Sequence, residues 1–490
     1  MVVMVAGWAA IVGRRARLAG VPCWSIATAF IACAALGCSS SKSQPPPDGS
    51  GGSIADASSG SGGTPVTSSG GNTGAGGAVA GSGGAIGSGG TGVGGAAMGT
   101  GGVAGAGAGG AGGGAGMLAS SSLAVRFANA VMARWPDPAN ITMTPAWEYN
   151  HGIVLRGIEQ VYRHTGDTRY VTYIRRYADE FINANGQFLN AGGMSTLPTD
   201  HSFDNIQPSV LLPFLFQQTG AAKYHTAADT IRARYDTIPR NADGGFWHKQ
   251  IYPNEMWLDG VYMGLPFLMR YATTFGTCGT FCADTVVAQA LLVANHVRDP
   301  ATGLLYHAWD DSPAGTKAVW ADPTTGRSPS VWGRAMGWYA MALVDMLPDI
   351  PADHANRSDL LAILTGMASA IRASQDTKTG LWFQVVDKGT QADDWIETSG
   401  SGMFVYALKV GVDRGYLDPS FMTVANSGWQ GLMAKVTTDA TGTPTITGAV
   451  QGMGVQNNYM GYINQLPTLS NSPHGLCAIL LAASEMEAAH

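Results

Sequence analysis

Two short patterns recur along this sequence, and they limit the folds that the chain can adopt. The first, TGDTRY at residues 165–170, returns as TGAAKY at residues 219–224, which is 54 positions later. Each copy joins two apolar stretches of helical length, so it is typical of a glycine turn between two helices. The flanking stretches are residues 154–162, 173–182, 210–216 and 227–238.

The second pattern is a glycine followed by an apolar and aromatic run. It reads GGFWH at residues 244–248, GLLYH at 303–307 and GLWFQ at 380–384, with spacings of 59 and 77. The last two copies continue to Asp310 and Asp387 at equal offsets. These runs are short and rich in aromatic residues, so they predict short strands in the loops between hairpins.

Repeats of this length indicate one supersecondary unit used several times. Residues 118–490 number about 370, and roughly 60 residues per unit gives six helical hairpins. An open stack of hairpins would need polar caps at both ends, whereas a closed ring would not. The sequence therefore predicts an all-α fold, an (α/α)6 barrel with short β-strands in its rim loops. An irregular helical bundle is the alternative.

The chain ahead of this domain has a different composition. Residues 51–116 contain 30 Gly and no Lys, Arg or Glu. Such a segment buries too little apolar area to offset its chain entropy, so we expect a disordered Gly/Ser-rich tether. The predicted domains are an export segment at 1–38, a linker at 39–117 and the barrel at 118–490.

The N-terminus has the features of an export signal. Three arginines within residues 14–17 precede an uncharged stretch at 18–37, which ends in Ala-Leu-Gly before Cys38. A short apolar run that ends in small residues is a signal segment and not a spanning helix. The box ending in Cys38 resembles a bacterial lipobox, so we expect lipidation there and a protein anchored to the cell envelope. The alternative is a cleaved signal and a secreted or periplasmic protein.

Charge and cysteine content exclude some classes of partner. Residues 118–490 carry 24 basic and 32 acidic side chains, a net charge of −8, without a basic run. Nucleic acid is therefore not expected as a partner. Separately, we expect the chain to be a monomer or dimer. Cys278 and Cys282 are too isolated for a zinc site, and in an exported protein they can close a small disulfide loop. Cys477 is expected to be buried.

The best single candidate for chemistry is Asp259. It follows an aromatic stretch and opens a strongly apolar segment in the sequence WLDG at residues 257–260. A carboxyl group at the junction of a loop and a buried helix is partly desolvated, which favours the protonated form that a general acid needs. The alternative is an aspartate that caps the helix N-terminus.

Tryptophans beside polar residues point to a sugar site. An aromatic face stacks on sugar C–H bonds while polar side chains bind hydroxyl groups. Arg334 lies between Trp332 and Trp338 in a nearly uncharged segment, so it needs either an acidic partner or an anionic ligand. Asp204 and Asp259 are the best pair of carboxyl groups, and such a pair is usual in glycosidases.

Several motifs together resemble one enzyme family, the unsaturated rhamnogalacturonyl hydrolases of glycoside hydrolase family 105, which are related to family 88. The resemblance covers about residue 118 to the C-terminus, and its most specific part is the run from residue 244 to residue 263. The motifs are FDNI at 203–206, GGFWHK at 244–249, YP at 252–253, MWLDGVYM at 256–263, WGR at 332–334, GWY at 337–339, ETS at 397–399 and MFVY at 403–406. The resemblance implies an (α/α)6 barrel and an enzyme without a metal or an organic cofactor.

The resemblance also implies a reaction. Substrates of this family are pectin or rhamnogalacturonan oligosaccharides with a 4,5-unsaturated terminal uronic acid. The residue matching Asp259 protonates C4 of the vinyl ether, water adds at C5, and the glycosidic bond breaks when the hemiketal opens. Asp204 matches a second aspartate of the site. The residues expected around the substrate are Tyr149, His248, Tyr252, His307, Trp332, Arg334 and Trp338, and residues 456–462 are expected to close the pocket.

Three other functions remain open from sequence. One is a conventional inverting glycosidase with Asp204 and Asp259 as its acid and base. Another is a non-catalytic surface lipoprotein that binds glycans. An isomerase or lyase on the same barrel is the third.

Overall fold

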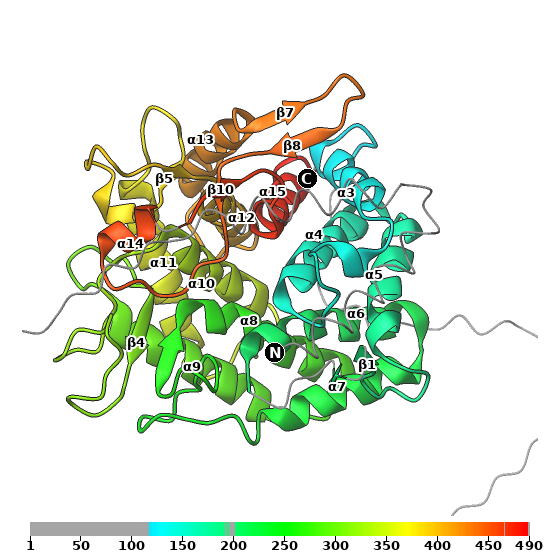
Figure 1. The fold of residues 1–490 in the computed structure, drawn as a ribbon, viewed down its shortest axis with the longest axis horizontal. Coiled ribbons are helices and arrows are strands. Elements are labelled where there is room, and N and C mark those ends of the chain that lie inside the picture. Colours follow the sequence, from blue (N-terminus) through cyan, green and yellow to red (C-terminus); the bar gives the residue numbers. More distant parts are fainter. Residues whose placement is uncertain (1–116, 192–193, 196–200, 465, 489–490) are drawn as a thin grey trace, which may run out of the picture. The chain divides into compact units, whose positions relative to one another are not determined.

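The computed structural model describes residues 117–191, 194–195, 201–464 and 466–488 (Figure 1). The predicted export segment with Cys38 lies outside these residues, as does the predicted tether up to residue 116. Among the described residues, no helix has both the length and the apolar character needed to cross a membrane.

Six helices of the described chain form an inner ring. Each packs against the next, and the last packs back onto the first, so the ring is closed (Figure 1). This confirms the predicted (α/α)6 barrel. The inner helices are α4 (Tyr149–Thr165), α6 (Leu211–Thr219), α8 (Leu258–Phe275), α10 (Gly333–Met346), α12 (Thr398–Asp413) and α15 (Pro473–Met486).

The outer helices complete the hairpins, and one pair joins the two ends of the domain. They are α5 (Thr168–Phe181), α7 (Ala222–Arg234), α9 (Phe281–Val297), α11 (Arg357–Ala373), α13 (Phe421–Met433) and α3 (Leu123–Arg134). Helix α3 packs on α15, and the Ala124 amide donates to the Glu487 carboxylate at 3.1 Å. The sixth pair therefore consists of the first and last helices of the described residues.

The predicted glycine turns end the first two inner helices. Gly166 and Gly220 both have φ of +64°, a left-handed conformation that glycine adopts without strain. Their amides donate to carbonyls of the last helical turn, at Tyr162 and Phe216. The TG pattern thus marks the C-terminal end of an inner helix.

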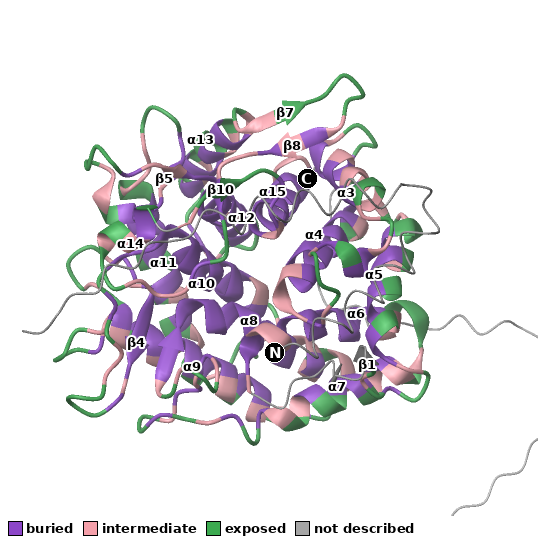
Figure 2. Cartoon of the chain, in the orientation of Figure 1, coloured by how far each residue is buried: buried purple, intermediate pink, exposed green. Residues whose placement is uncertain are grey.

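The core lies within and between the two rings (Figure 2). Inner helices α8, α10 and α12 are buried on nearly every face, whereas outer helices such as α5 and α7 expose their outer side. This difference follows from their sequences, because a helix that is apolar all round must be enclosed.

Short elements fill the loops. Strand β3 (Glu255–Trp257) pairs antiparallel with β4 (Ala308–Asp310), and β5 (Trp382–Phe383) pairs with β6 (Ile396–Glu397). Strands β3 and β6 lead directly into inner helices α8 and α12. The other elements are β1 (Asn190–Ala191), β2 (Met194–Ser195), β7 (Val436–Thr438), β8 (Pro444–Ile446), β9 (Ala449–Val450), β10 (Thr468–Leu469), α14 (Tyr459–Asn464) and the 3-10 helices η1 (Pro138–Asn140), η2 (Phe203–Asn205), η3 (Gln207–Val210) and η4 (Val386–Lys388).

The cysteines of the described chain follow expectation. Cys278 and Cys282 form a disulfide that links the turn after α8 to the first turn of α9. Cys477 is free and fully buried in α15.

Candidate active site

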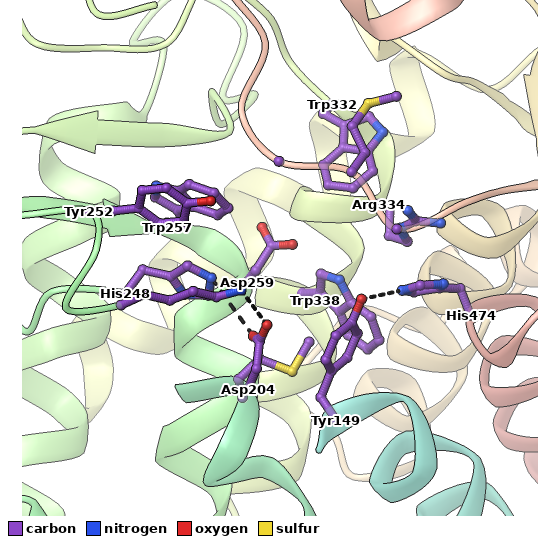
Figure 3. Close-up of a pocket in the computed structure, with 15 residues that line it drawn as sticks. Tyr149, Asp204, His248, Tyr252, Trp257, Asp259, Trp332, Arg334, Trp338 and His474 are labelled. Carbon is purple, nitrogen blue, oxygen red and sulfur yellow. Dashed lines mark hydrogen bonds and ion pairs between the residues drawn. The ribbon is translucent and has the colours of Figure 1, made fainter. Parts of the chain in front are cut away.

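A cavity of about 260 Å³ lies at the end of the barrel where the inner helices begin. Asp204 and Asp259 lie between two groups of side chains (Figure 3). On one side are the rings of His248, Tyr252 and Trp257, which we call the aromatic wall, and on the other are Arg334 and His474. The cavity is lined by Tyr149, Asp204, His248, Lys249, Tyr252, Trp257, Asp259, Met263, Trp332, Arg334, Trp338, Gly452, Met453, Gly454 and His474. Eight of the nine residues predicted for the pocket are among them, and His307 is the ninth.

Asp259 is the second residue of α8, and its side chain does not cap the helix. The N-cap position belongs to Trp257, and no side chain accepts a capping hydrogen bond there. Asp259 is only 8% exposed and lines the cavity. Two other inner helices show what a capping carboxylate looks like, because Glu148 and Glu397 accept backbone N–H bonds at the starts of α4 and α12.

His307 lies behind Asp259 and is fully buried. Its Nε2 is 3.1 Å from Oδ2 of Asp259, and its Nδ1 is 2.9 Å from the hydroxyl of Tyr462. The imidazole is thus positioned to act on the carboxyl group rather than to line the cavity.

Asp204 comes from η2 and is held by the segment that precedes β3. Lys249 Nζ lies 2.5 Å from its Oδ2, and His248 Nε2 lies 3.8 Å from its Oδ1. Burial raises the pKa of Asp204, Lys249 opposes that rise, and the charge of Asp259 adds to it. Burial lowers the pKa of His248 well below its usual value, so this imidazole is neutral near neutral pH.

Three rings form the aromatic wall. The Trp257 ring stacks on His248 at 4.4 Å and on Tyr252 at 5.0 Å between ring centroids. The indole N–H of Trp257 donates to Glu255 at 2.8 Å, and Trp257 belongs to a small buried cluster with Ala308 and Trp320. The wall is therefore a fixed flat surface on which the apolar face of a sugar can stack.

Arg334 is the second residue of α10 and is only 1% exposed. Its Nη1 donates to the Val450 carbonyl at 2.6 Å and to Ser399 at 3.2 Å, and its Nη2 donates to the Gln451 carbonyl at 2.6 Å. Its Nε has no partner among the described residues, and it forms no ion pair with any of them. The sequence predicted either an acidic partner or an anionic ligand for Arg334. No acidic partner is observed among the described residues, because Glu397 accepts a hydrogen bond from Ser399 and does not contact the guanidinium directly.

Tyr149 and His474 connect the first inner helix to the last. The Tyr149 hydroxyl lies 3.2 Å from Nε2 of His474. Burial, followed by the charge of Asp204, raises the pKa of Tyr149, so this group remains a neutral phenol. Burial and the nearby Arg334 hold the pKa of His474 well below its usual value. The ring of Trp338 lies edge-on to His474 at 6.3 Å.

Sequence reasoning missed several lining residues. Lys249 follows the predicted residue His248, and Trp257 lies two positions before Asp259, so the motifs that contain them gave a usable signal. His474 follows Ser472 and Pro473, a helix-start pattern that marks the beginning of an inner helix. Residues 452–454 lie in a glycine-rich loop without such a signal. From the predicted closing segment, Tyr462 contacts His307 behind the cavity.

The site thus combines the buried carboxyl group of Asp259, the half-buried one of Asp204, a guanidinium whose Nε–H has no partner among the described residues, and a stacking surface. The N-terminal ends of the inner helices add backbone N–H groups that favour negative charge. No group of three or more metal-ligating side chains occurs among the described residues.

Three known proteins illustrate what the chain is similar to. Protein Atu3128 of Agrobacterium fabrum is 34% identical over 238 residues, which are 46% of this chain and 97% of that protein. The unsaturated rhamnogalacturonyl hydrolase YesR of Bacillus subtilis is 26% identical over 269 residues, which are 54% of this chain and 70% of that protein. A solved family 105 glycoside hydrolase from C. acetobutylicum has a TM-score of 0.68 and 36% identity, covering 75% of this chain and 99% of that one.

One family accounts for the whole barrel. Residues 123–490 match Glycosyl Hydrolase Family 88. This range begins at the first residue of α3 and includes every residue that lines the cavity. Together with the family 105 structure, the match confirms the resemblance that the sequence motifs indicated. The chain belongs to glycosyl hydrolase family 88.

Proposed function

We propose that this glycoside hydrolase acts on oligosaccharides from pectin or rhamnogalacturonan that end in a 4,5-unsaturated uronic acid. The observation that carries the proposal is Asp259, a buried carboxyl group with one oxygen held by His307 and with access to a cavity. The name of the Bacillus subtilis relative, an unsaturated rhamnogalacturonyl hydrolase, supports the same substrate class.

In the proposed reaction, Asp259 gives its proton to C4 of the vinyl ether. C5 then develops oxocarbenium character, and the new carboxylate takes a proton from the water that adds there. The hemiketal opens and the glycosidic bond breaks as a consequence. One group serves as acid and then as base, because loss of its proton makes it a base.

Arg334 is the proposed contact for the uronate carboxylate. Its Nε–H and one Nη2 hydrogen have no partner among the described residues. These two donors lie on one edge of the guanidinium, and such an edge binds a carboxylate with two parallel hydrogen bonds. The stacked Trp257 and Tyr252 would then hold the sugar against Asp259.

Asp204 is proposed to assist and not to serve as a separate base. Its Oδ2 is paired with Lys249 at 2.5 Å, which leaves it poorly placed to activate a water molecule. This pairing argues against the conventional inverting mechanism, in which two carboxyl groups flank the sugar with room for water between them.

The test uses the full-length protein and an unsaturated disaccharide produced by a rhamnogalacturonan lyase. We expect the ultraviolet absorbance of the conjugated enol ether to disappear as sugar is released. Cleavage of saturated glycosides alone would instead indicate the conventional mechanism. Binding without any turnover would indicate a glycan-binding protein.

We further propose that the enzyme is exported and anchored through a lipid on Cys38. The basis is the sequence of residues 14–38. Labelling of bacterial cells with a tagged fatty acid should modify the wild-type protein and leave the Cys38→Ser variant unlabelled. Equal labelling of both proteins would disprove the anchor.

A further inference from the structure

Tyr462 is the far end of a buried hydrogen-bond chain that reaches Asp259. Its hydroxyl lies 2.9 Å from Nδ1 of His307, and Nε2 of His307 lies 3.1 Å from Oδ2 of Asp259. Tyr462 and His307 are both 0% exposed, and both lie outside the set of described residues that line the cavity. Tyr462 therefore has no direct contact with a sugar in the cavity; its hydrogen bond leads to Asp259 through His307, and its ring lies 6.2 Å from that of Trp332 between centroids.

The surroundings of the Tyr462 hydroxyl determine where the protons lie in this chain. Burial raises the pKa of Tyr462, opposed by a hydrogen bond from the Gln456 backbone, and the side chain stays a neutral phenol. Among the described residues, Nδ1 of His307 is the one acceptor within hydrogen-bond distance of this buried hydroxyl, and donation to Nδ1 leaves no phenol proton unpaired. An imidazole that accepts at Nδ1 carries its proton on Nε2.

This tautomer distinguishes the two oxygens of Asp259. The Nε2–H of His307 donates to Oδ2, so Oδ2 is an acceptor in both the acid and the carboxylate form. Oδ1 is then the oxygen that holds the carboxyl proton and exchanges it with a molecule in the cavity. With the opposite tautomer, Nε2 would accept a proton from Oδ2, and the proton would point away from the substrate.

The backbone at Tyr462 is held by side chains that do not line the cavity. Gln384 Nε2 donates to the Tyr462 carbonyl at 2.9 Å. Trp395 Nε1 donates to the carbonyl of the next residue, Ile463, at 3.2 Å. Because both contacts fix the backbone here, the hydroxyl keeps its place beside Nδ1 of His307.

We propose that Tyr462 is a positioning residue that fixes the His307 tautomer and so places the transferable proton of Asp259 on Oδ1. The inference rests on the proposed role of Asp259 as the acid. In the step, the O–H bond at Oδ1 breaks while the alkene π pair forms the C–H bond at C4. Oδ1 then accepts a proton from the water that adds at C5, which restores the starting carboxyl group.

A kinetic test compares two tyrosine-to-phenylalanine variants of the full-length protein. In Tyr462→Phe the histidine loses its donor, and we expect kcat to fall about tenfold with KM changed less than about twofold. The control is Tyr339→Phe, because Tyr339 is also fully buried and donates to the Ala290 carbonyl at 2.9 Å, outside the cavity. An unchanged kcat in Tyr462→Phe, or equal losses in both variants, would overturn the proposal.

A spectroscopic test needs no substrate and so separates this inference from the proposed function. In protein labelled with ¹⁵N-histidine, the His307 signals are identified by their loss in His307→Gln. We expect the wild-type imidazole to carry its proton on Nε2, and Tyr462→Phe to shift the population toward Nδ1–H. A wild-type Nδ1–H tautomer would overturn the inference whatever the substrate proves to be.

Discussion

The two ends of the barrel differ in the charged partners that they offer to carboxyl groups. At the end where the inner helices begin, the cavity holds Asp204 and Asp259. At the end where they finish, a second cavity of about 380 Å³ has four arginines among its lining residues. We call this second region the arginine end; its charged lining residues are Arg156, Arg163, Arg270, Asp345, Asp349 and Arg414.

The pKa values of carboxyl groups at the two ends reflect these different surroundings. Burial alone would raise the pKa of Glu159 at the arginine end, but the charges of Arg270, Arg163 and Arg156 outweigh it and lower the pKa to about 2. At the cavity end, burial raises the pKa of Asp204 despite Lys249, and raises that of Glu255 to about 7.

The comparison teaches that burial does not by itself decide the protonation of a carboxyl group. Glu159 contacts Arg163 at 2.6 Å and Arg270 at 2.8 Å, so its charge is compensated and serves the fold. Asp349 at the same end has no ion pair among the described residues, and burial raises its pKa. Close guanidinium groups therefore make the difference: they lower the pKa of Glu159, whereas the single ammonium of Lys249 does not prevent the rise in the pKa of Asp204.

The largest predicted effect is that of Asp259→Asn. The amide cannot donate the proton to C4, so kcat should fall by at least about 10³-fold while the melting temperature stays near that of the wild type. Kinetics and thermal unfolding measure the two quantities. Asp349→Asn at the arginine end is the matched control and should keep full activity. Near-normal turnover in Asp259→Asn would identify another residue as the acid.

The opposite pattern is expected for Glu159→Gln. It removes the shared partner of the arginines, so the free energy of unfolding should fall by about 3–5 kcal/mol. The kcat of the folded variant should remain close to the wild-type value. Because the folded pKa of Glu159 lies below its ordinary 4.5, its contribution is present above pH 4.5 and is lost as the pH falls toward 2. Denaturant titrations across that range test this, and loss of activity without loss of stability would contradict it.

A smaller effect of opposite sign is predicted for Glu255→Gln. The folded pKa of Glu255 is about 7 against an ordinary 4.5, so the folded protein binds the extra proton and its stability falls as the pH rises between these values. Above that range the variant should be more stable than the wild type by up to about 3 kcal/mol, and the difference should vanish near pH 4.5. A variant that is less stable at every pH would show that the Glu255 charge is compensated.

The smallest effect should follow from removal of the disulfide near the arginine end. The Cys278→Ser, Cys282→Ser double variant opens a loop with a sequence separation of 4. So short a loop should contribute at most about 2 kcal/mol to the free energy of unfolding, with no change in kcat. A change in activity would mean that the two ends of the barrel are coupled.

Local signals explain what could be predicted from the sequence. The TG turns identified helical hairpins because a left-handed residue at a helix end strongly favours glycine. The position of Asp259 in the first turn of α8, directly after β3, followed from the switch between an aromatic loop and an apolar run. The other predicted cavity residues also lie in short local motifs, so they could be predicted in the same way.

Long-range contacts explain what could not be predicted. Nothing local in α3 shows that it pairs with α15. The partners of Arg334 are backbone carbonyls at Val450 and Gln451, which any residue would supply. The hydrogen bonds from Tyr462 through His307 to Asp259 join three segments that are distant in sequence, and no local pattern in any of them predicts these contacts.

The central claim is that the enzyme protonates an alkene and does not attack an acetal carbon. An analogue of the unsaturated disaccharide with a carbon atom in place of the glycosidic oxygen tests it most directly, because it retains the vinyl ether but has no glycosidic bond to hydrolyse. We predict that the wild-type protein removes the alkene absorbance of this analogue and forms a ketone at C5, and that Asp259→Asn does neither. An analogue left intact by an enzyme that cleaves the natural disaccharide would contradict the account.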